Sequence, residues 1–383
     1  MTTARGSRVL LRGGRKLDAG GRQDGFWVLF DGGTIAACGT AGPPAADRVV
    51  DLAGAWLTPG FVDLHVHGGG GHAAEDGADG MRGALAAHRA HGTTRSLISL
   101  VAAPIEQLEA SLAAIADLTR TDARVLGAHL EGPFLASSRC GAHGPAYLRL
   151  PTPDVVERLL RASRGTLRQV TIAPELPGAL DAVGRFAAAG VTVAVGHTEA
   201  DMALTARAFD AGARLLTHAF NAMPGLGHRS PGPVGAALAD RRVTLELVLD
   251  GQHVHPAVAG LLLAGAPGRV ALVSDAMAAA GAGDGSYRLG RSDVVVRDGV
   301  ARLAGTGLLA GSTLTLEAAL RRAVRVVGLD PVAAVTALTR TPARVLGLDD
   351  RIGRLAPGRA ADAVVLDEDW SVRAVWAGGR PIR

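Results

Sequence analysis

Two histidines, His65 and His67, end an apolar stretch of the sequence, "TPGFVDLHVHG" at 58–68. Because side chains alternate along a β-strand, residues two apart share one face, and these two imidazoles are expected to point the same way. Two interpretations are open. The pair is either satisfied by hydrogen bonds at the end of a strand, or it binds a metal. A single pair does not decide between them, and the rest of the chain has to.

Side chains of the same chemical types recur at the ends of later apolar stretches. They are His129 and Glu131, Glu175, His197, His218 and Asn221, Asp250 with His253, and Asp275. Buried polar groups cost free energy unless they have partners, so packing alone explains this recurrence poorly. Imidazole and carboxylate ligands suit zinc, with iron, manganese or cobalt as possible substitutes.

Three of these residues, Glu131, His197 and His218, would form a three-ligand metal site with a position open for water. That pattern is typical of catalytic zinc rather than structural zinc. Such a metal lowers the pKa of a bound water toward ~7. Asp275 then fits a general base that later acts as a general acid, although taken alone it would fit a helix N-cap equally well.

Eight short apolar segments are predicted to be the strands that position these side chains. They are 57–67, 93–101, 123–132, 167–175, 191–198, 213–221, 243–251 and 269–276. Helix-like segments lie between them, and two of these, 104–120 and 153–164, begin with proline, as helices often do. Eight strand-then-helix units predict a (β/α)8 TIM-like barrel, whose active sites lie at the carboxyl ends of the strands. A doubly wound open sheet is the competing fold.

The two ends of the chain differ from the middle, because residues 7–56 and 345–383 show short alternating strands with turns. Chain termini often lie close together, so we predict that both ends form one small β-sandwich domain, 1–57 plus 345–383. Residues 58–344 are the predicted catalytic barrel. A further β-like piece at 287–305 interrupts the last barrel unit.

The charge of the chain excludes some functions. The net charge of +4 comes from arginine, since Lys16 is the only lysine, so no lysine in the barrel can bridge two metals. The arginines are spread along the chain and aromatic residues make up only 3% of it, which argues against a nucleic-acid partner.

Targeting features are equally sparse in the sequence. The two cysteines, Cys38 and Cys140, form no disulfide framework. No apolar run approaches the ~18 residues of a membrane span, and residues 1–14 do not resemble a signal peptide. We therefore expect a cytoplasmic protein with no membrane partner.

Several longer stretches resemble one known family. They include "GAHLEGPFL", "VAVGHTEA", "LTHAFNAMPGLGHRSPG", "LVLDGQHVHP", "LVSDAM" and the tail "PARVLGLDDRIGRLAPGRAADAVVLD". In this order, and over nearly the whole chain, they resemble the amidohydrolase superfamily and, within it, the N-acetylglucosamine-6-phosphate deacetylases. The "HLEGPF" and "THAFNAMP" stretches are specific to that branch, whereas the tail and the paired histidines are common to the superfamily.

The resemblance implies hydrolysis of the acetamide of N-acetylglucosamine-6-phosphate to glucosamine-6-phosphate and acetate. It implies Glu131, His197 and His218 as metal ligands, Asp275 as the catalytic acid/base, and His143 as the residue that polarises the substrate carbonyl. It also implies a homodimer in which the partner subunit contributes to the phosphate site. The implied substrate contacts are Ala142, His143, Asn221, Ala222, Arg229, Asp250, His253, Leu309, Ala310 and Gly311.

Several questions about the site stay open from the sequence alone. Because His65 and His67 are present, a second metal is favoured over a single metal, with Glu131 as the bridge between the two, Asp275 nearby and zinc as the expected ion. His255 competes with His253 as the contact from its loop. Cys140 is an incidental small residue or a redox-sensitive group in a lid.

Two rival functions are open for the whole protein. One is that of another amidohydrolase acting on a different N-acyl sugar, and the other is that of a non-catalytic sugar-phosphate sensor.

Overall fold

The computed structural model describes residues 8–383, so part of the N-terminal stretch in which we expected no signal peptide lies outside the described residues. The chain divides into two compact units. Our division at residues 57/58 and 344/345 stays a prediction. One unit holds the described residues up to Val62, with His88–Arg95 and Leu316–Arg383, and the other holds Asp63–Ala87 and Ser96–Thr315.

The central feature of the fold is a sheet of eight strands in the order β15-β14-β13-β12-β11-β10-β9-β6. Each of the eight apolar segments singled out in the sequence contains one of these strands. The strands are β6 (Phe61–Asp63), β9 (Thr93–Val101), β10 (Val125–Glu131), β11 (Leu167–Ile172), β12 (Thr192–Val195), β13 (Leu215–Leu216), β14 (Thr244–Val248) and β15 (Val270–Val273). Neighbours from β9 to β15 pair in parallel, as successive strand-then-helix units require.

The sheet closes just beyond the carboxyl ends of its two edge strands. A parallel bridge joins Val66 to Ala276. The N–H of Asp275 donates to the carbonyl of His65 at 2.8 Å, and the N–H of His67 donates to the carbonyl of Ala276 at 2.8 Å. The predicted barrel is therefore confirmed, and the open sheet is excluded. Closure at this end also puts the two paired histidines next to Asp275.

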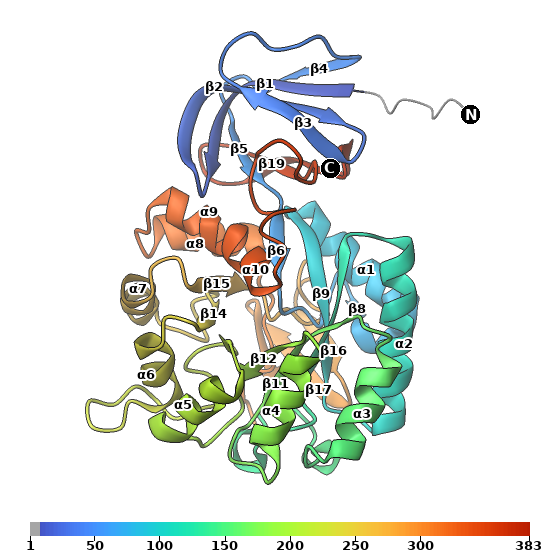
Figure 1. The fold of residues 1–383 in the computed structure, drawn as a ribbon, viewed down its shortest axis with the longest axis vertical. Coiled ribbons are helices and arrows are strands. Elements are labelled where there is room, and N and C mark those ends of the chain that lie inside the picture. Colours follow the sequence, from blue (N-terminus) through green and yellow to red (C-terminus); the bar gives the residue numbers. More distant parts are fainter. Residues whose placement is uncertain (1–7) are drawn as a thin grey trace. The chain divides into compact units, whose positions relative to one another are not determined.

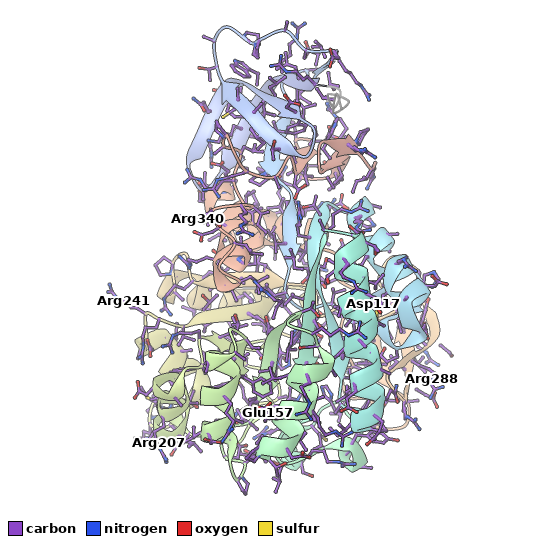
Figure 2. All side chains as sticks on the ribbon, turned by 45° about the vertical axis from the view of Figure 1, so that its right-hand side comes forward. Asp117, Glu157, Arg207, Arg241, Arg288 and Arg340 are labelled. Carbon is purple, nitrogen blue, oxygen red and sulfur yellow. The ribbon has the colours of Figure 1, made fainter. Side chains whose placement is uncertain are left out.

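Helices surround the barrel strands, as Figure 1 shows for α2 to α7. In α2 the apolar residues Leu108, Leu112 and Ile115 fall on one stripe and are buried, and each contributes about 1.5–3 kcal/mol of burial free energy. The charged side chains labelled in Figure 2 on these helices, such as Glu157 and Arg207, lie on the exposed side. The helices are α1 (Gly77–Ala90), α2 (Ile105–Thr121), α3 (Pro153–Ala162), α4 (Ala179–Ala188), α5 (Met202–Ala211), α6 (Gly232–Ala239) and α7 (Pro256–Gly265).

The β-like piece predicted at 287–305 is a three-stranded antiparallel sheet, formed by β16 (Gly285–Leu289), β17 (Ser292–Arg297) and β18 (Val300–Leu303). Its inner residues Val294 and Val296 pack in one cluster with Val101, Met277 and Ala310. This packing fixes the sheet against the carboxyl-end loops of the barrel. A two-stranded hairpin, β7 (Gly68–Gly69) and β8 (His72–Ala73), follows the paired histidines.

Both ends of the chain join one sheet in the other unit, as the sequence predicted. Strand β19, from the C-terminal segment, pairs antiparallel with β5 from the N-terminal segment. Alternate residues of β2 enter different apolar clusters, Phe26, Val28 and Phe30 in one and Trp27 with Leu29 in the other. The strands are β1 (Arg8–Asp18), β2 (Gly21–Asp31), β3 (Thr34–Gly39), β4 (Arg48–Asp51), β5 (Trp56–Pro59), β19 (Ala363–Leu366), β20 (Val372–Ala377) and β21 (Arg380–Pro381).

Three further helices complete this unit, α8 (Leu316–Arg325), α9 (Pro331–Leu338) and α10 (Arg340–Val345). The first turn of α9 is capped by Asp330, whose carboxylate accepts from the N–H groups of Val332 and Ala333. Among the described residues, no helix has both the length and the apolar character needed to cross a membrane.

Candidate active site

Side chains from five barrel strands and one loop converge at the carboxyl end of the barrel. Glu131 is the last residue of β10, and His197, His218 and Asp275 each follow their strand by two residues. His65 and His67 come after β6, and His143 lies on the loop after β10. The members of this cluster, which we call the histidine cluster, are His65, His67, Glu131, His143, His197, His218 and Asp275, and all are buried.

Glu131 is the centre of the histidine cluster, because each of its carboxylate oxygens faces at least two imidazoles. Its Oε1 lies 3.2 Å from Nε2 of His197, 3.0 Å from Nε2 of His218 and 3.3 Å from Nε2 of His65. Its Oε2 lies 3.1 Å from Nε2 of His67 and 3.2 Å from Nε2 of His143. The prediction that Glu131 would meet both histidine pairs thus has a direct geometric counterpart.

The hydrogen bonds of their Nδ1 atoms fix the tautomers of two histidines, His197 and His65. Nδ1 of His197 lies 2.7 Å from the carbonyl of Arg139, to which only an N–H can donate. Nδ1 of His65 lies 3.2 Å from Glu246 Oε2, which is likewise an acceptor. A neutral ring with its proton on Nδ1 presents the lone pair of Nε2, so both rings aim a lone pair at Glu131.

This arrangement fits a bound cation. Nε2 of His197 lies 3.0 Å from Nε2 of His218, and Nε2 of His65 lies 3.1 Å from Nε2 of His67. Lone pairs that face each other and a carboxylate repel unless a positive charge lies among them. His65, His67, Glu131 and Asp275 each offer one ligand atom, and these atoms lie within 4.8 Å of one another. The donor set of imidazoles and carboxylates is one that divalent transition metals prefer.

Without a cation, the carboxylates and imidazoles of the histidine cluster shift one another's pKa values. Burial alone would raise the pKa of Glu131, but its close contacts with His65, His143, His197 and His218 hold that pKa well below its usual range. Burial lowers the pKa of His197 to about 4 despite the neighbouring Glu131. Burial lowers the pKa of His65 and of His218, but the neighbouring carboxylates of Glu131 and Asp275 raise both pKa values above the ordinary one. A bound cation would displace these protons, because metal ligation requires ionised carboxylates and neutral imidazoles.

His143 differs from His65 and His197 in its tautomer. Its Nδ1 accepts a hydrogen bond of 3.1 Å from the backbone N–H of Ala102, so the neutral ring carries its proton on Nε2. That Nε2 lies 3.2 Å from Glu131 Oε2. His143 is therefore built as a hydrogen-bond donor at the edge of the cluster. Such a donor can polarise a carbonyl oxygen.

The backbone is strained where three members of the histidine cluster follow their strands. His197, His218 and Asp275 have φ values of +48°, +24° and +49°. A positive φ is uncommon for residues other than glycine and costs about 1–3 kcal/mol at each such position. Residues held this way concentrate at functional sites. These turns carry the side chains of His197 and His218 that contact Glu131, and that of Asp275, which contacts His65 and His67.

A cavity of about 490 Å³ opens above the histidine cluster. The residues predicted for the substrate that line it include Ala142, Asn221, Ala222 and His253, together with Leu309 and Gly311 of the predicted sugar loop. His253 reaches the cavity because its Nδ1 is held 2.7 Å from Asp250 Oδ2. His255 instead caps α7, where its Nδ1 accepts from the N–H of Ala257.

Three residues predicted as substrate contacts are not among the described residues that line this cavity. Asp250 lies behind His253 and fixes its ring. Ala310 is fully buried and its N–H donates to the carbonyl of Ala301, so it supports the loop rather than forming its surface. Arg229 is exposed, with its Nη1 at 2.7 Å from Nε2 of its neighbour His228.

Several residues near the site were missed from sequence. Ser138, Arg139, Leu289, Arg302 and Leu308 line the cavity. Arg302 comes from β18, whose alternating pattern indicated a strand but not which way it faces. Glu246 had a visible signal, since it is a lone charged residue in the apolar strand "VTLELVL".

His129 and Glu175 support the site and are not among the described residues that line its cavity. Both ring nitrogens of His129 are bonded within the barrel, Nδ1 to Ser99 Oγ at 2.9 Å and Nε2 to Thr171 Oγ1 at 3.0 Å. Glu175 accepts from the Thr198 hydroxyl and from the N–H of Glu199 at 2.6 Å. It therefore holds the turn that carries His197.

Comparison with known proteins agrees with this geometry. The amidohydrolase family model matches residues 56–382. An N-acetylgalactosamine-6-phosphate deacetylase of Escherichia coli O157:H7 is 40% identical over 97% of this chain and 98% of its own length. An N-acetylglucosamine-6-phosphate deacetylase of Vibrio furnissii is 34% identical over 94% of this chain and 91% of its own.

A solved structure gives the same result in three dimensions. It is a point mutant of the N-acetyl-D-glucosamine-6-phosphate deacetylase from Mycobacterium smegmatis in complex with N-acetyl-D-glucosamine-6-phosphate. It is 44% identical to this chain, covers 98% of it and 100% of the other chain, and superposes with a TM-score of 0.94. The matching family model, these relatives and the strand-end cluster agree, and the chain belongs to the amidohydrolase family.

Proposed function

We propose that this protein hydrolyses the acetamide of N-acetylglucosamine-6-phosphate to glucosamine-6-phosphate and acetate. The observation that supports this most is the convergence of Glu131, His197 and His218 with Asp275 at the floor of one cavity. Similarity to deacetylases of amino-sugar phosphates over nearly the whole chain supports the substrate class.

Glu131, His197 and His218 would hold a divalent metal, with His65, His67 and Asp275 as the proposed ligands of a second one. Zinc is the proposed ion, because three such ligands with an open position are typical of catalytic zinc. A divalent metal supplies Lewis acidity and a water acidic enough to ionise near neutral pH.

Two residues of the chain would move or hold protons around the scissile amide. Asp275 would take the proton of the attacking water and later deliver it to the departing amine nitrogen, as one carboxylate can when it serves as base and then acid. The Nε2–H of His143 would donate to the acetyl oxygen as negative charge develops there. The burial of both side chains keeps competing water away from these hydrogen bonds.

The phosphate would be recognised by side chains at the mouth of the cavity, with His253 and Asn221 from the chain itself. Arg229 is exposed on its loop and outside the cavity of its own chain. We propose that it serves the phosphate site of a partner subunit in a homodimer, since a guanidinium can donate two parallel hydrogen bonds to a phosphate. The cytoplasm is the proposed compartment, in keeping with two cysteines that are both free.

N-acetylgalactosamine-6-phosphate is a second candidate substrate. The relative that is 40% identical over 97% of this chain carries that activity in its name, and the two sugars differ only in the configuration at C4. The same metal, acid/base and phosphate contacts would serve both. A sensor without activity is disfavoured, because no proposed ligand and no proposed catalytic group is missing from the chain.

The experiment is acetate release by the zinc-loaded protein from N-acetylglucosamine-6-phosphate, N-acetylgalactosamine-6-phosphate and unphosphorylated N-acetylglucosamine, with Asp275→Asn as the control. We expect turnover of at least the first sugar, little turnover of the unphosphorylated one, and a loss of about 10²–10⁴-fold in the control. A preference for the galacto sugar would make the second candidate the function. Activity on none of the three would disprove the deacetylase proposal.

A further inference from the structure

A buried carboxylate outside the predicted ligand set contacts two parts of the histidine cluster. Glu246, in the middle of β14, has an exposed fraction of 0%. Its Oε2 lies 3.2 Å from Nδ1 of His65 and 3.3 Å from the backbone N–H of His218. Its Oε1 accepts a hydrogen bond of 2.7 Å from the side-chain amide of Gln169. Every oxygen of this carboxylate is thus directed at a named donor inside the barrel.

We infer that Glu246 is a positioning residue that fixes His65 as a metal ligand by accepting its Nδ1 proton. The inference rests on the proposed function, because it concerns the same metal centre. It adds a residue that touches neither the cavity nor the reacting atoms, and that would act only through His65 and the His218 backbone.

The contact with Glu246 fixes the tautomer of His65. A neutral imidazole has one N–H, and when Nδ1 holds it Nε2 keeps a lone pair. Nε2 of His65 lies 3.3 Å from Glu131 Oε1 and 3.4 Å from Asp275 Oδ1, so this lone pair points at the centre of the cluster. A carboxylate behind a metal-binding histidine both holds the ring and makes its lone pair more basic.

The partner histidine, His67, has no comparable support among the described residues. Nδ1 of His67 is buried and has no hydrogen-bond partner among the described residues. His65 is therefore the held member of the pair, and His67 is the member free to choose its tautomer. Loss of the Glu246 carboxylate would leave both rings of the pair without a fixed tautomer, and would weaken the metal position that they share.

The Glu246 carboxylate itself costs free energy where it lies. The other residues of β14 are Thr244, Leu245, Leu247 and Val248, and all are buried. Burying a charge in such a strand costs free energy unless its partners compensate it. A protein with well-packed apolar residues at such a position is often as stable or more stable. A role toward the histidine cluster explains why a charge is present at this position.

The test is zinc affinity, measured by titrating the metal-free protein against a competing chelator and by metal analysis after dialysis. Two variants remove different parts of the interaction. Glu246→Gln keeps an oxygen that can accept from His65 but removes the charge, and Glu246→Leu removes the acceptor altogether. Mutation of residues that hydrogen-bond to metal ligands weakens metal affinity by about 10- to 100-fold. At the site that fills last in the titration, we therefore expect zinc to bind about tenfold more weakly in Glu246→Gln and about a hundredfold more weakly in Glu246→Leu.

Glu317 offers a matched control in the other unit. It is also a buried glutamate bonded to a histidine, His91 at 2.5 Å, and none of the proposed metal ligands contacts it among the described residues. Glu317→Gln and Glu317→Leu should leave zinc affinity unchanged. Circular dichroism checks that each variant folds. If Glu246→Leu does not fold, the zinc affinity of Glu246→Gln tests the inference.

Zinc affinities of the folded Glu246 variants equal to that of the wild type would overturn the inference. The same holds if the Glu317 variants lose zinc affinity to the same extent, since the effect would then be general destabilisation. Acetate release is measured separately on the wild type. Glu246-dependent zinc binding without acetate release would refute the proposed function alone, and acetate release with unchanged affinities would refute this inference alone.

Discussion

Glu131 and Glu317 are both buried glutamates, one in each unit of the chain, with exposed fractions of 4% and 8%. Glu317 accepts from His91, from Arg321 and from the N–H of Val372 at 2.7 Å. Glu131 instead faces the Nε2 atoms of five histidines, His65, His67, His143, His197 and His218. Burial is nearly equal in the two places, so the difference lies in the partners.

The partners of a buried carboxylate separate a structural one from one that belongs to a site. Around Glu317 every contact is a donor to the carboxylate, and one guanidinium supplies positive charge at all relevant pH values. Around Glu131 at least two of the rings present lone pairs, since their Nδ1 atoms donate elsewhere. A cluster of acceptors without a fixed cation is arranged for a cation that binds.

The largest effect should come from removing the charge of Glu131. We expect Glu131→Gln to lose tightly bound zinc and to lower kcat/KM by on the order of a thousandfold or more, because the metal contributes several kcal/mol to transition-state stabilisation. Metal analysis and acetate release measure both effects. Chelator-treated wild-type protein should regain activity with added zinc, and recovery of the variant under the same conditions would show that Glu131 is not a ligand.

A second, smaller effect should separate the donor from the ligands of the same cluster. We expect His143→Gln to lower kcat by about 10²–10³-fold, the usual result of removing one donor to a developing oxyanion. Zinc content should stay at the wild-type level, since His143 carries its proton on the nitrogen that faces Glu131. Loss of zinc in this variant would place His143 among the ligands instead.

The opposite pattern is expected at Glu317. Glu317→Gln should lower the free energy of unfolding by about 1–3 kcal/mol, because it disturbs buried hydrogen bonds to His91 and Val372. Denaturant unfolding measures this change. The kcat of the folded variant should equal that of the wild type, and a large fall in kcat with unchanged stability would remove the contrast between the two glutamates.

The smallest effect is the pH dependence of that stability difference. Burial would raise the pKa of Glu317, but hydrogen bonds from His91 and from the backbone of Val372 hold it below its usual value. A carboxyl with a lowered folded-state pKa stabilises the protein above its unfolded pKa of about 4.3, and this stabilisation is lost as pH falls through the folded value.

The free-energy difference between wild type and Glu317→Gln should therefore be constant from about pH 6 to pH 8 and shrink below about pH 4.3. Urea unfolding at a series of pH values tests this. A difference that grows as pH falls would mean that the carboxyl is protonated in the native state.

The sequence predicted the barrel well, because each strand is a short apolar run that ends in a polar residue. The limits of the least regular strand were the hardest to predict. Residues 213–221 were predicted as one strand, but β13 ends at Leu216. The chain then turns through positive φ values at His218, Phe220 and Ala222. Such turns depend on side chains that meet across the barrel, and no local pattern shows them.

The same limit applied to the site. Strand-end histidines and carboxylates could be found from sequence because parallel strands of a barrel bring their carboxyl ends together. The partner of His65 could not, since Glu246 is 181 residues away in the chain and lies in the middle of a strand. Tautomers were equally hidden, because the bond from Ala102 to His143 follows from the path of a loop.

The loop that carries His143 is tied at two points to His197, a proposed metal ligand. The carbonyl of His197 accepts from the N–H of Ala136 at 2.9 Å, and Nδ1 of His197 donates to the carbonyl of Arg139 at 2.7 Å. A sugar that draws this loop inward therefore also changes how firmly His197 is held. By thermodynamic reciprocity, the factor by which substrate tightens metal binding equals the factor by which metal tightens substrate binding. The enzyme would then retain its metal best while it is occupied by substrate.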